Sequence, residues 1–236
     1  NEILTANRNS LQLFDMLHSM RQFDDLTYVH SVNVALIASI LGQWLKFSEK
    51  DIRILTISGL LHDIGKIMIP NEILTKPGKL TIAEYNIMKQ HVNFGYEKVK
   101  NQNIDIRIKE ACLLHHEKCD GTGYPFGLKS DHIPAVAKII AIADVYDAMT
   151  SARVYRGALC PFEVIDTMYK DAFTKFEPEY ILPFLKNVAS SYINNDVRLS
   201  DGRIGKVVLI NENALSLPIV QCEDEFIDLS KTRGLT

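Results

Sequence analysis

Two short segments, far apart in the chain, combine histidine with other metal-binding side chains, and this pairing constrains the fold more than any other feature. The first contains His62 followed directly by Asp63, and the second runs from His115 to Pro125 with the sequence HHEKCDGTGYP. Only folding can bring them together. A carboxylate can bridge two cations through its two oxygens, which a neutral imidazole cannot do. We therefore expect the segments to share a metal cluster in which Asp63 is the bridge.

Five of the seven histidines are candidate metal ligands. His30 and His91 each lie beside an expected core helix, where a lone histidine is more often a buried structural residue than a ligand. Together with the two segments above, they supply enough imidazoles for a shared cluster. We therefore interpret His30 and His91 as metal ligands instead of buried structural residues. We assign no such role to His18 and His132.

Two aspartates, Asp144 and Asp147, lie in an otherwise apolar stretch with the sequence IIAIADVYDAM. A helix N-cap or an ion pair is the ordinary explanation for such a carboxylate. Asp144 lies well past the expected start of its helix at Pro134, so a ligand role explains it better. For Asp147, a hydrogen bond to a ligand or to solvent is a sufficient explanation.

Hydrophobic periodicity predicts an all-α body with a small β appendage at its C-terminal end. Helical spacing of apolar residues and start signals predict helices over residues 11–20, 28–45 and 104–116, and after Ser48, Thr81, Pro134, Pro161 and Pro178. Residues 70–80 are expected to be loop, and the helix after Thr81 is expected to carry His91. From Asp196 the pattern changes to two short strands around an Asp-Gly turn, with a third after Pro218.

Composition narrows the function classes. The length of 236 residues suits one large domain, or one domain with a small appendage. A net charge of -3 argues against binding to a nucleic-acid polymer. Four scattered cysteines fit a reducing cytoplasmic compartment. Because the first residue is Asn1 rather than Met, we expect an upstream sensory region, which in the full-length protein could also be a membrane anchor.

Taken together, these residues resemble a known family. The chain is similar to the HD-GYP family, a branch of the HD superfamily of metal-dependent phosphohydrolases. The similarity lies in His30, the segment HDIGK, His91, and the segments HHEKCDGTGYP and IADVYDAMTSARVYR. The resemblance implies an HD-type all-α helical bundle that forms a catalytic domain over residues 27–195. Residues 1–26 would be a helix or linker from a truncated upstream region, and residues 196–236 a small β extension.

The resemblance implies two divalent metal ions. One would be held by His30, His62, Asp63 and Asp144. The other would be held by Asp63, His91, His115 and His116. Some family members hold a third ion with a glutamate at the position that is Leu26 here; Leu26 cannot bind a metal, and Asp24 or Asp25 remains as an alternative. Imidazole and carboxylate ligands without thiolates suit Fe or Mn, the expected metals, and also Zn or Ni.

Family members hydrolyse the bacterial second messenger cyclic di-GMP, which implies the same reaction here, with pGpG, GMP or both as products. A hydroxide that bridges two metals is a nucleophile at neutral pH, because the cations lower the pKa of bound water from about 15.7 towards 7. Asp63 and Lys66 are the expected catalytic residues. Lys66 follows His62 by one helical turn, and with Arg153 and Arg156 it is expected to bind phosphate. By themselves, these cations would be a solvated basic face.

Other functions remain open. The chain could sense a cyclic dinucleotide without cleaving it, or it could be an HD hydrolase of another cyclic dinucleotide. All seven expected ligands are present, which favours catalysis.

Glu117 is expected to orient a metal-bound histidine, and Asp120 to hydrogen-bond the backbone of its own loop. In the family, this loop has been viewed as a docking surface for diguanylate cyclase domains. The C-terminal strands are expected to pack on the bundle or to pair subunits in a homodimer.

Overall fold

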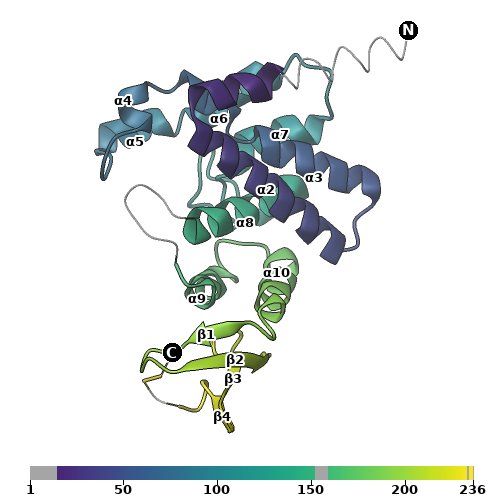
Figure 1. The fold of residues 1–236 in the computed structure, drawn as a ribbon. Helices are drawn as coiled ribbons and strands as arrows, with labels where there is room; N and C mark the ends of the chain where they lie inside the picture. Colours follow the sequence, from purple (N-terminus) through teal and green to yellow (C-terminus); the bar gives the residue numbers. More distant parts are fainter. Residues whose placement is uncertain (1–14, 152–158, 233, 236) are drawn as a thin grey trace.

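The computed structural model describes residues 15–151, 159–232 and 234–235, and shows a helical bundle followed by a small sheet (Figure 1). The helices are α2 (Asp25–Trp44), α3 (Glu49–Leu61), η1 (Ile64–Met68), α4 (Asn71–Leu74), α5 (Ile82–Met88), α6 (His91–Val99), α7 (Ile106–Leu114), η2 (Ser130–His132), α8 (Ala135–Thr150), α9 (Pro161–Asp171) and α10 (Pro178–Ser191). The strands are β1 (Asp196–Arg198), β2 (Ile204–Leu209), β3 (Ile219–Cys222) and β4 (Glu225–Asp228). Residues 15–23 are also helical. The expected fold class, an all-α bundle with a C-terminal β appendage, is confirmed.

Local capping explains where several helices begin. Ser48 is the N-cap of α3 and accepts a hydrogen bond from a backbone N–H of the first turn. At α5, Thr81 accepts from the N–H of Glu84, and the Glu84 carboxylate accepts from the N–H of Thr81, which completes the expected capping box. Each such cap stabilises a helix by about 0.5–2 kcal/mol. Pro161 and Pro178 begin α9 and α10, as the sequence predicts.

Two details between residues 70 and 99 differ from the expectation. Residues 70–80, expected to be loop, contain the short helix α4. The helix that begins after Thr81 ends at Met88, and His91 begins a separate helix, α6. Burial explains the break: α5 has no buried residue, whereas α6 buries His91 together with residues of its next two turns. The two segments therefore differ in environment, α5 on the surface and α6 in the bundle.

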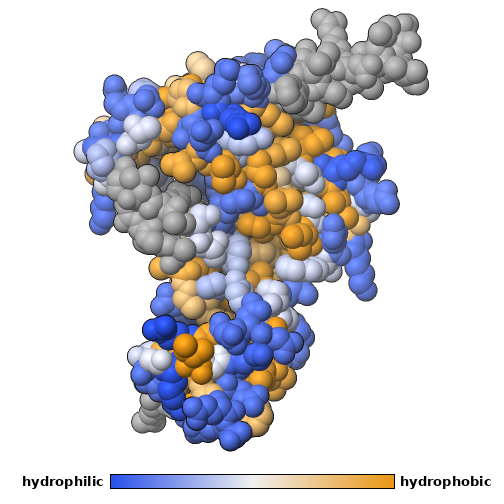
Figure 2. All heavy atoms as spheres, viewed as in Figure 1, coloured by the Kyte–Doolittle hydropathy of each residue, from blue (hydrophilic) through white to orange (hydrophobic). Residues whose placement is uncertain are grey.

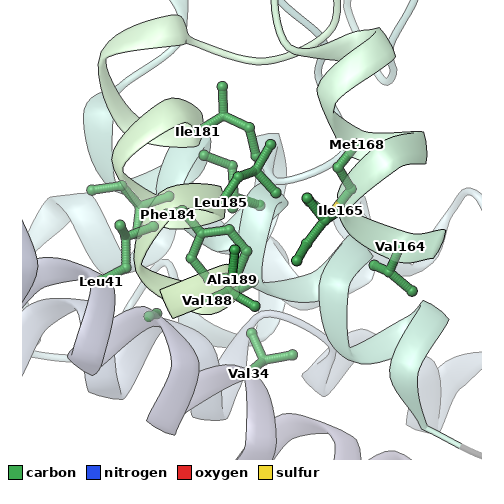
Figure 3. Packing of buried hydrophobic residues seen from close by; sticks show 14 of the residues in the cluster. Val34, Leu41, Val164, Ile165, Met168, Ile181, Phe184, Leu185, Val188 and Ala189 are labelled. Atoms are coloured by element: carbon green, nitrogen blue, oxygen red, sulfur yellow. The ribbon is translucent and has the colours of Figure 1, made fainter. Parts of the chain in front are cut away.

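One large hydrophobic cluster extends through the bundle, beside a small one of Leu114, Ile133 and Ala137. Figure 3 shows part of the large cluster, where Val34 of α2, Ile165 of α9 and Phe184 of α10 lie together. Helix α8 packs against α2, α3, α7, α9 and α10. Helices α2 and α3 approach closely at Gly59, where a Cβ atom would lie 2.5 Å from the Cα of Ala35. This approach brings the middle of α2 next to the C-terminal end of α3.

The C-terminal sheet is antiparallel, with strand order β1-β2-β3-β4 (Figure 1). The expected Asp201-Gly202 turn joins β1 to β2, and Gly202 has a φ of +93°, which favours glycine. Strand β3 lies after Pro218 as expected, whereas β4 was not predicted. Val207 and Val220 belong to the same hydrophobic cluster as the bundle, so the sheet shares its core.

Helix α2 is apolar on its exposed face as well as on its buried face. By length and composition alone it could cross a membrane, and 39% of its most apolar stretch is buried in the bundle. Val34 and Leu41 lie in the core, while Leu36 and Ile40 are exposed. Figure 2 shows apolar atoms gathered over this part of the surface. A helix of a soluble core passes the same membrane test, so the finding is weak evidence for a membrane span.

Candidate metal centre

Five helices bring the seven predicted ligands together inside the bundle. His30 comes from α2, His62 and Asp63 from the end of α3, His91 from the start of α6, His115 and His116 from the end of α7, and Asp144 from α8. The most deeply buried members, each no more than 1% exposed, are His62, Asp63, His91 and His115. Burying so many ionisable groups costs free energy unless they have partners, so such a cluster indicates a functional site.

The two carboxylate oxygens of Asp63 face different sets of imidazoles. Oδ2 lies 3.2 Å from Nε2 of His62 and 3.7 Å from Nε2 of His30. Oδ1 lies 3.3 Å from Nε2 of His91 and 4.0 Å from Nε2 of His115. Asp63 therefore stands between two groups of candidate ligands, with one oxygen directed to each.

The spacing of the ligand atoms fits shared metal ions. Two atoms that bind one ion at about 2.1 Å lie about 3.0 Å apart when adjacent and about 4.2 Å apart when opposite. His30 Nε2 lies 2.9 Å from Asp144 Oδ1, and His91 Nε2 lies 3.4 Å from His115 Nε2. Two groups have one ligand atom per residue with all such atoms within 4.8 Å of one another: Asp63, His91, His115 and His116, and His30, His62 and Asp144. The cluster can therefore hold metal ions.

Hydrogen bonds through Nδ1 orient four of the histidines. The Nδ1 atoms of three of them lie 2.7, 2.8 and 2.9 Å from backbone carbonyl oxygens, in the pairs His62–Gly59, His91–Met88 and His115–Ala111. A carbonyl oxygen only accepts, so each Nδ1 carries the proton. His30 Nδ1 lies 2.6 Å from Oδ2 of Asp147. In all four rings Nε2 is left to face the centre, as metal-binding histidines require.

Two buried polar atoms at the centre indicate whether the site suits a metal ion. Within the described part of the chain, His62 Nε2 and Asp63 Oδ1 have no hydrogen-bond partner although both are buried. Leaving a buried polar atom unpaired costs about 1–3 kcal/mol. Cations on either side of the Asp63 carboxylate would satisfy both atoms, since each is a lone-pair donor. The residues present therefore fit a pair of ions.

His116 is held differently from the other histidines. Its ring is stacked on the ring of Tyr124, with centroids 4.7 Å apart and planes inclined by 30°. Its Nδ1 lies 3.8 Å from Oδ2 of Asp144. Tyr124 belongs to the loop after α7, and its backbone N–H donates to the carbonyl oxygen of His116. The sequence contained Tyr124 in its most specific motif, but nothing in the motif indicated this ring contact.

Burial and local charge set the protonation of the cluster. Burial lowers the pKa of His91, and it lowers the pKa of His116 to about 3, so both are neutral and able to bind a cation. Burial also opposes the charged form of His30, but hydrogen bonds with Asp144 and Asp147 outweigh it and raise the pKa to about 9. For Asp63, burial favours the protonated acid, yet neighbouring cationic groups, Lys66 first, hold the pKa well below its usual value.

Lys66 lies in the site, but not for the reason that the sequence suggested. Helix α3 ends at Leu61 with His62 as its cap, and Lys66 lies on the 3₁₀ helix η1. The expected α-helical turn between His62 and Lys66 is therefore wrong. Instead, the ammonium of Lys66 lies 2.6 Å from Oδ2 of Asp63, three residues earlier.

The positions considered for a third metal lie outside the cluster. Leu26 is 63% exposed. Asp24 is the N-cap of α2, where its carboxylate accepts from the N–H groups of Leu26 and Thr27. Asp25 has a side chain that is 84% exposed. Arg153 and Arg156, expected to bind phosphate, lie outside the described residues.

The loop after His116 is organised by a buried carboxylate. Glu117 is 4% exposed, and its two oxygens accept hydrogen bonds from the backbone N–H groups of Phe126, Gly127 and Leu128. The expectation that Glu117 orients a histidine is therefore wrong, because it shapes the loop. Asp120 accepts from the N–H of Thr122 in its own loop, as expected.

A comparison with known proteins identifies the family. The family model described as HD domain matches residues 10–180. This chain belongs to the HD domain family. The HD-GYP resemblance is confirmed by curated relatives, among them a cyclic di-GMP phosphodiesterase of Pseudomonas aeruginosa, 36% identical over 86% of this chain and 49% of its own length. The response regulator RpfG of Xanthomonas campestris, named a cyclic di-GMP phosphodiesterase, is 36% identical over 80% of this chain and 50% of its own length.

Further comparisons support the HD fold. A 3′3′-cGAMP-specific phosphodiesterase of Vibrio cholerae is 40% identical over 60% of this HD chain and 33% of its own length. The HD domain of the L. monocytogenes phosphodiesterase PgpH, solved with cyclic-di-AMP, has a TM-score of 0.58 at 18% identity, over 75% of this chain and 95% of that one. That likeness supports the fold alone. This HD chain spans about half the length of the first curated relatives it matches.

Proposed function

We propose that this chain is the catalytic part of a metal-dependent phosphodiesterase that hydrolyses cyclic di-GMP to pGpG, GMP or both. The observation that carries the proposal is Asp63, whose two oxygens face two separate groups of imidazoles. Two metal ions separated by the width of one carboxylate group are the arrangement that two-metal phosphoryl transfer uses. The names of the relatives agree with this activity.

The ligand sets follow the two sides of Asp63. The first ion would be held by His30, His62, Asp63 and Asp144, and the second by Asp63, His91, His115 and His116. Two divalent ions bound here would supply a nucleophilic water at neutral pH and would offset charge on the phosphoryl oxygens. Iron or manganese suits these nitrogen and oxygen donors, with zinc or nickel as alternatives.

The protein's own side chains prepare the site for an anion. Asp147 holds the His30 ring through Nδ1, which directs Nε2 to Asp144 in the centre. Lys66 has a side chain that is 22% exposed, so its ammonium can turn from Asp63 towards a phosphoryl oxygen when metal ions take over the charge of that carboxylate. Arg153 and Arg156 are proposed to pair with the same phosphate.

A second candidate substrate is another cyclic dinucleotide. Relatives named 3′3′-cGAMP-specific phosphodiesterases are 35–40% identical to this chain, in the same range as those named for cyclic di-GMP. A module that senses a cyclic dinucleotide without cleaving it is disfavoured, because all seven ligands converge and five of them are buried.

We place the catalytic domain at residues 27–195 and the β extension at residues 196–236. A cytoplasmic location is proposed from the reduced-thiol pattern, since none of the cysteines is in a C-x-x-C pair.

The loop organised by Glu117 carries Phe126, which is 63% exposed, and is proposed as a docking surface for a diguanylate cyclase domain. The β extension is proposed to pair subunits in a homodimer.

The decisive test is an assay of the metal-loaded chain. Protein purified without air and reconstituted with Mn²⁺ or Fe²⁺ is incubated with cyclic di-GMP, 3′3′-cGAMP and cyclic di-AMP, and products are separated by chromatography. We expect cyclic di-GMP to be opened and Asp63→Ala to abolish the reaction. Preferential cleavage of 3′3′-cGAMP would favour the second candidate. Two bound ions without cleavage of any of the three substrates would contradict catalysis and favour the sensor.

A further inference from the structure

Lys89 lies at the edge of the metal centre, in contact with two tyrosine rings. Its ammonium is 5.3 Å from the centroid of the Tyr85 ring and 5.9 Å from the centroid of the Tyr124 ring. Tyr124 is the ring that stacks on His116. Only one aromatic ring therefore separates the Lys89 charge from a candidate ligand of the second ion.

Among the described residues, no carboxylate neutralises the charge of Lys89. Within the described residues, Lys89 makes no ion pair at 4.0 Å or less, whereas Lys66 pairs with Asp63 and Lys76 pairs with Glu84. A ring face attracts an ammonium, but less strongly than a negatively charged group does. The two tyrosines thus hold Lys89 in place without neutralising it, and the cation stays available to an anion.

A cyclic dinucleotide brings two negative charges to such a site. Its ring contains two phosphodiesters, and only one can occupy the metal centre at a time. The second phosphate then lies beside the centre and needs a counter-charge of its own. Lys89, whose ammonium contacts the ring that stacks on His116, is a described cation placed to meet this need.

We propose that Lys89, held between Tyr85 and Tyr124, binds the phosphate of the cyclic dinucleotide that is not being cleaved. This inference rests on the proposed function and names a specificity residue for it. Lys89 recognises a substrate with two linked phosphates, while the metal centre suffices for a substrate with one. Tyr85, which is 49% exposed, contacts the ammonium at a position that a ligand can reach from solvent.

The test compares a substrate with two phosphodiesters and one with a single phosphodiester. Rates of Mn²⁺-loaded wild type and Lys89→Met are measured with cyclic di-GMP and with bis(p-nitrophenyl) phosphate. We expect the KM for cyclic di-GMP to rise about tenfold with kcat changed less than about twofold, and the preference for cyclic di-GMP to fall accordingly. Lys89→Arg is expected to recover most of the loss.

Lys98→Met is the matched control, because Lys98 is an exposed lysine on the neighbouring helix α6. Circular dichroism and metal content verify that each variant is folded and loaded. An unchanged KM for cyclic di-GMP, or equal losses on both substrates, would overturn the inference while leaving the proposed function intact. Cleavage of bis(p-nitrophenyl) phosphate by a wild type that opens no cyclic dinucleotide would refute the proposed function, and the inference with it.

Discussion

The ring of Tyr124 is stacked on the ring of His116, with their centroids 4.7 Å apart. The Nδ1 atoms of the other four candidate ligand histidines are oriented by hydrogen bonds to backbone carbonyls or to Asp147. Across the part of the chain that the structure describes, His116 has this ring contact in place of such a bond. Outer contacts of metal ligands commonly change affinity by about 10–100-fold, and stacking can serve the same purpose as a hydrogen bond.

Removing the Tyr124 ring is expected to weaken the second metal site. In Tyr124→Leu the His116 ring loses its stacking partner, so we expect about tenfold weaker binding of one of two ions. Tyr124→Phe keeps the ring and should bind both ions as wild type does. Competition with a chromophoric chelator measures the two affinities. Equal affinities in Tyr124→Leu and wild type would show that stacking does not position His116.

The hydrogen bond from His30 to Asp147 leads to a matching prediction for the first site. Asp147 is oriented by Asn33 and Ser151, which donate to its Oδ1, while Oδ2 receives His30 Nδ1–H. Asp147→Ala is expected to weaken the first ion by about 10–100-fold and to spare the second. Competition with the chromophoric chelator measures the affinity of each ion. A loss confined to the second ion, or no loss, would contradict the assignment.

Residue types and their adjacency made much of the site predictable. A histidine next to an aspartate, and two adjacent histidines beside a loop, are local patterns that depend little on packing. The side chains that shape the site depend on backbone geometry instead. Lys66 was assigned to an α-helical turn, although the chain leaves α3 at Leu61 and continues as a 3₁₀ helix.

Loop and turn conformations account for the other errors. The roles of Glu117 and Tyr124 follow from a loop in which one carboxylate collects three backbone N–H groups, and no periodic pattern encodes that arrangement. Strand β4 was missed because the turn before it contains Glu223 at a φ of 53° instead of a glycine or asparagine. The hydrophobic periodicity that predicts the helices gives no signal at these positions.

Two glycines that face each other should respond in opposite ways to alanine. At Gly65 a Cβ atom would lie 1.9 Å from the carbonyl oxygen of His91, whereas at Gly95 the nearest atom would be 3.4 Å away. We expect Gly65→Ala to lower the free energy of unfolding by about 3 kcal/mol. Gly95→Ala should be neutral or stabilising by up to about 1 kcal/mol, because alanine favours the helix. Urea denaturation measures both, and equal effects would contradict the close packing.

Cysteine reactivity should separate Cys112 from Cys160. Burial raises the pKa of the Cys112 thiol to about 12, and Cys160 is exposed. At pH 8 we expect iodoacetamide to modify Cys160 in the folded protein and Cys112 only after unfolding. Mass spectrometry of the peptides identifies the modified sites. Rapid modification of Cys112 in the folded protein would show that it is not buried.

The same pKa shift makes stability depend on pH. Because the folded pKa of Cys112 lies above its value in the unfolded chain, its contribution is fully present below about pH 9. The contribution is lost as the pH rises towards 12. In Cys112→Ala the free energy of unfolding should therefore fall less steeply over this range than in wild type. Identical slopes would contradict the shift.

Metal content is the most direct test of the bridging role of Asp63. Wild type, His116→Ala and Asp63→Ala are purified without air, reconstituted with Mn²⁺, desalted and analysed for bound metal by mass spectrometry, with circular dichroism to verify folding. The account predicts two ions per chain in wild type, about one in His116→Ala, and a loss at both sites in folded Asp63→Ala. A wild type that holds one ion at saturation, or an Asp63→Ala variant that keeps two, would contradict it.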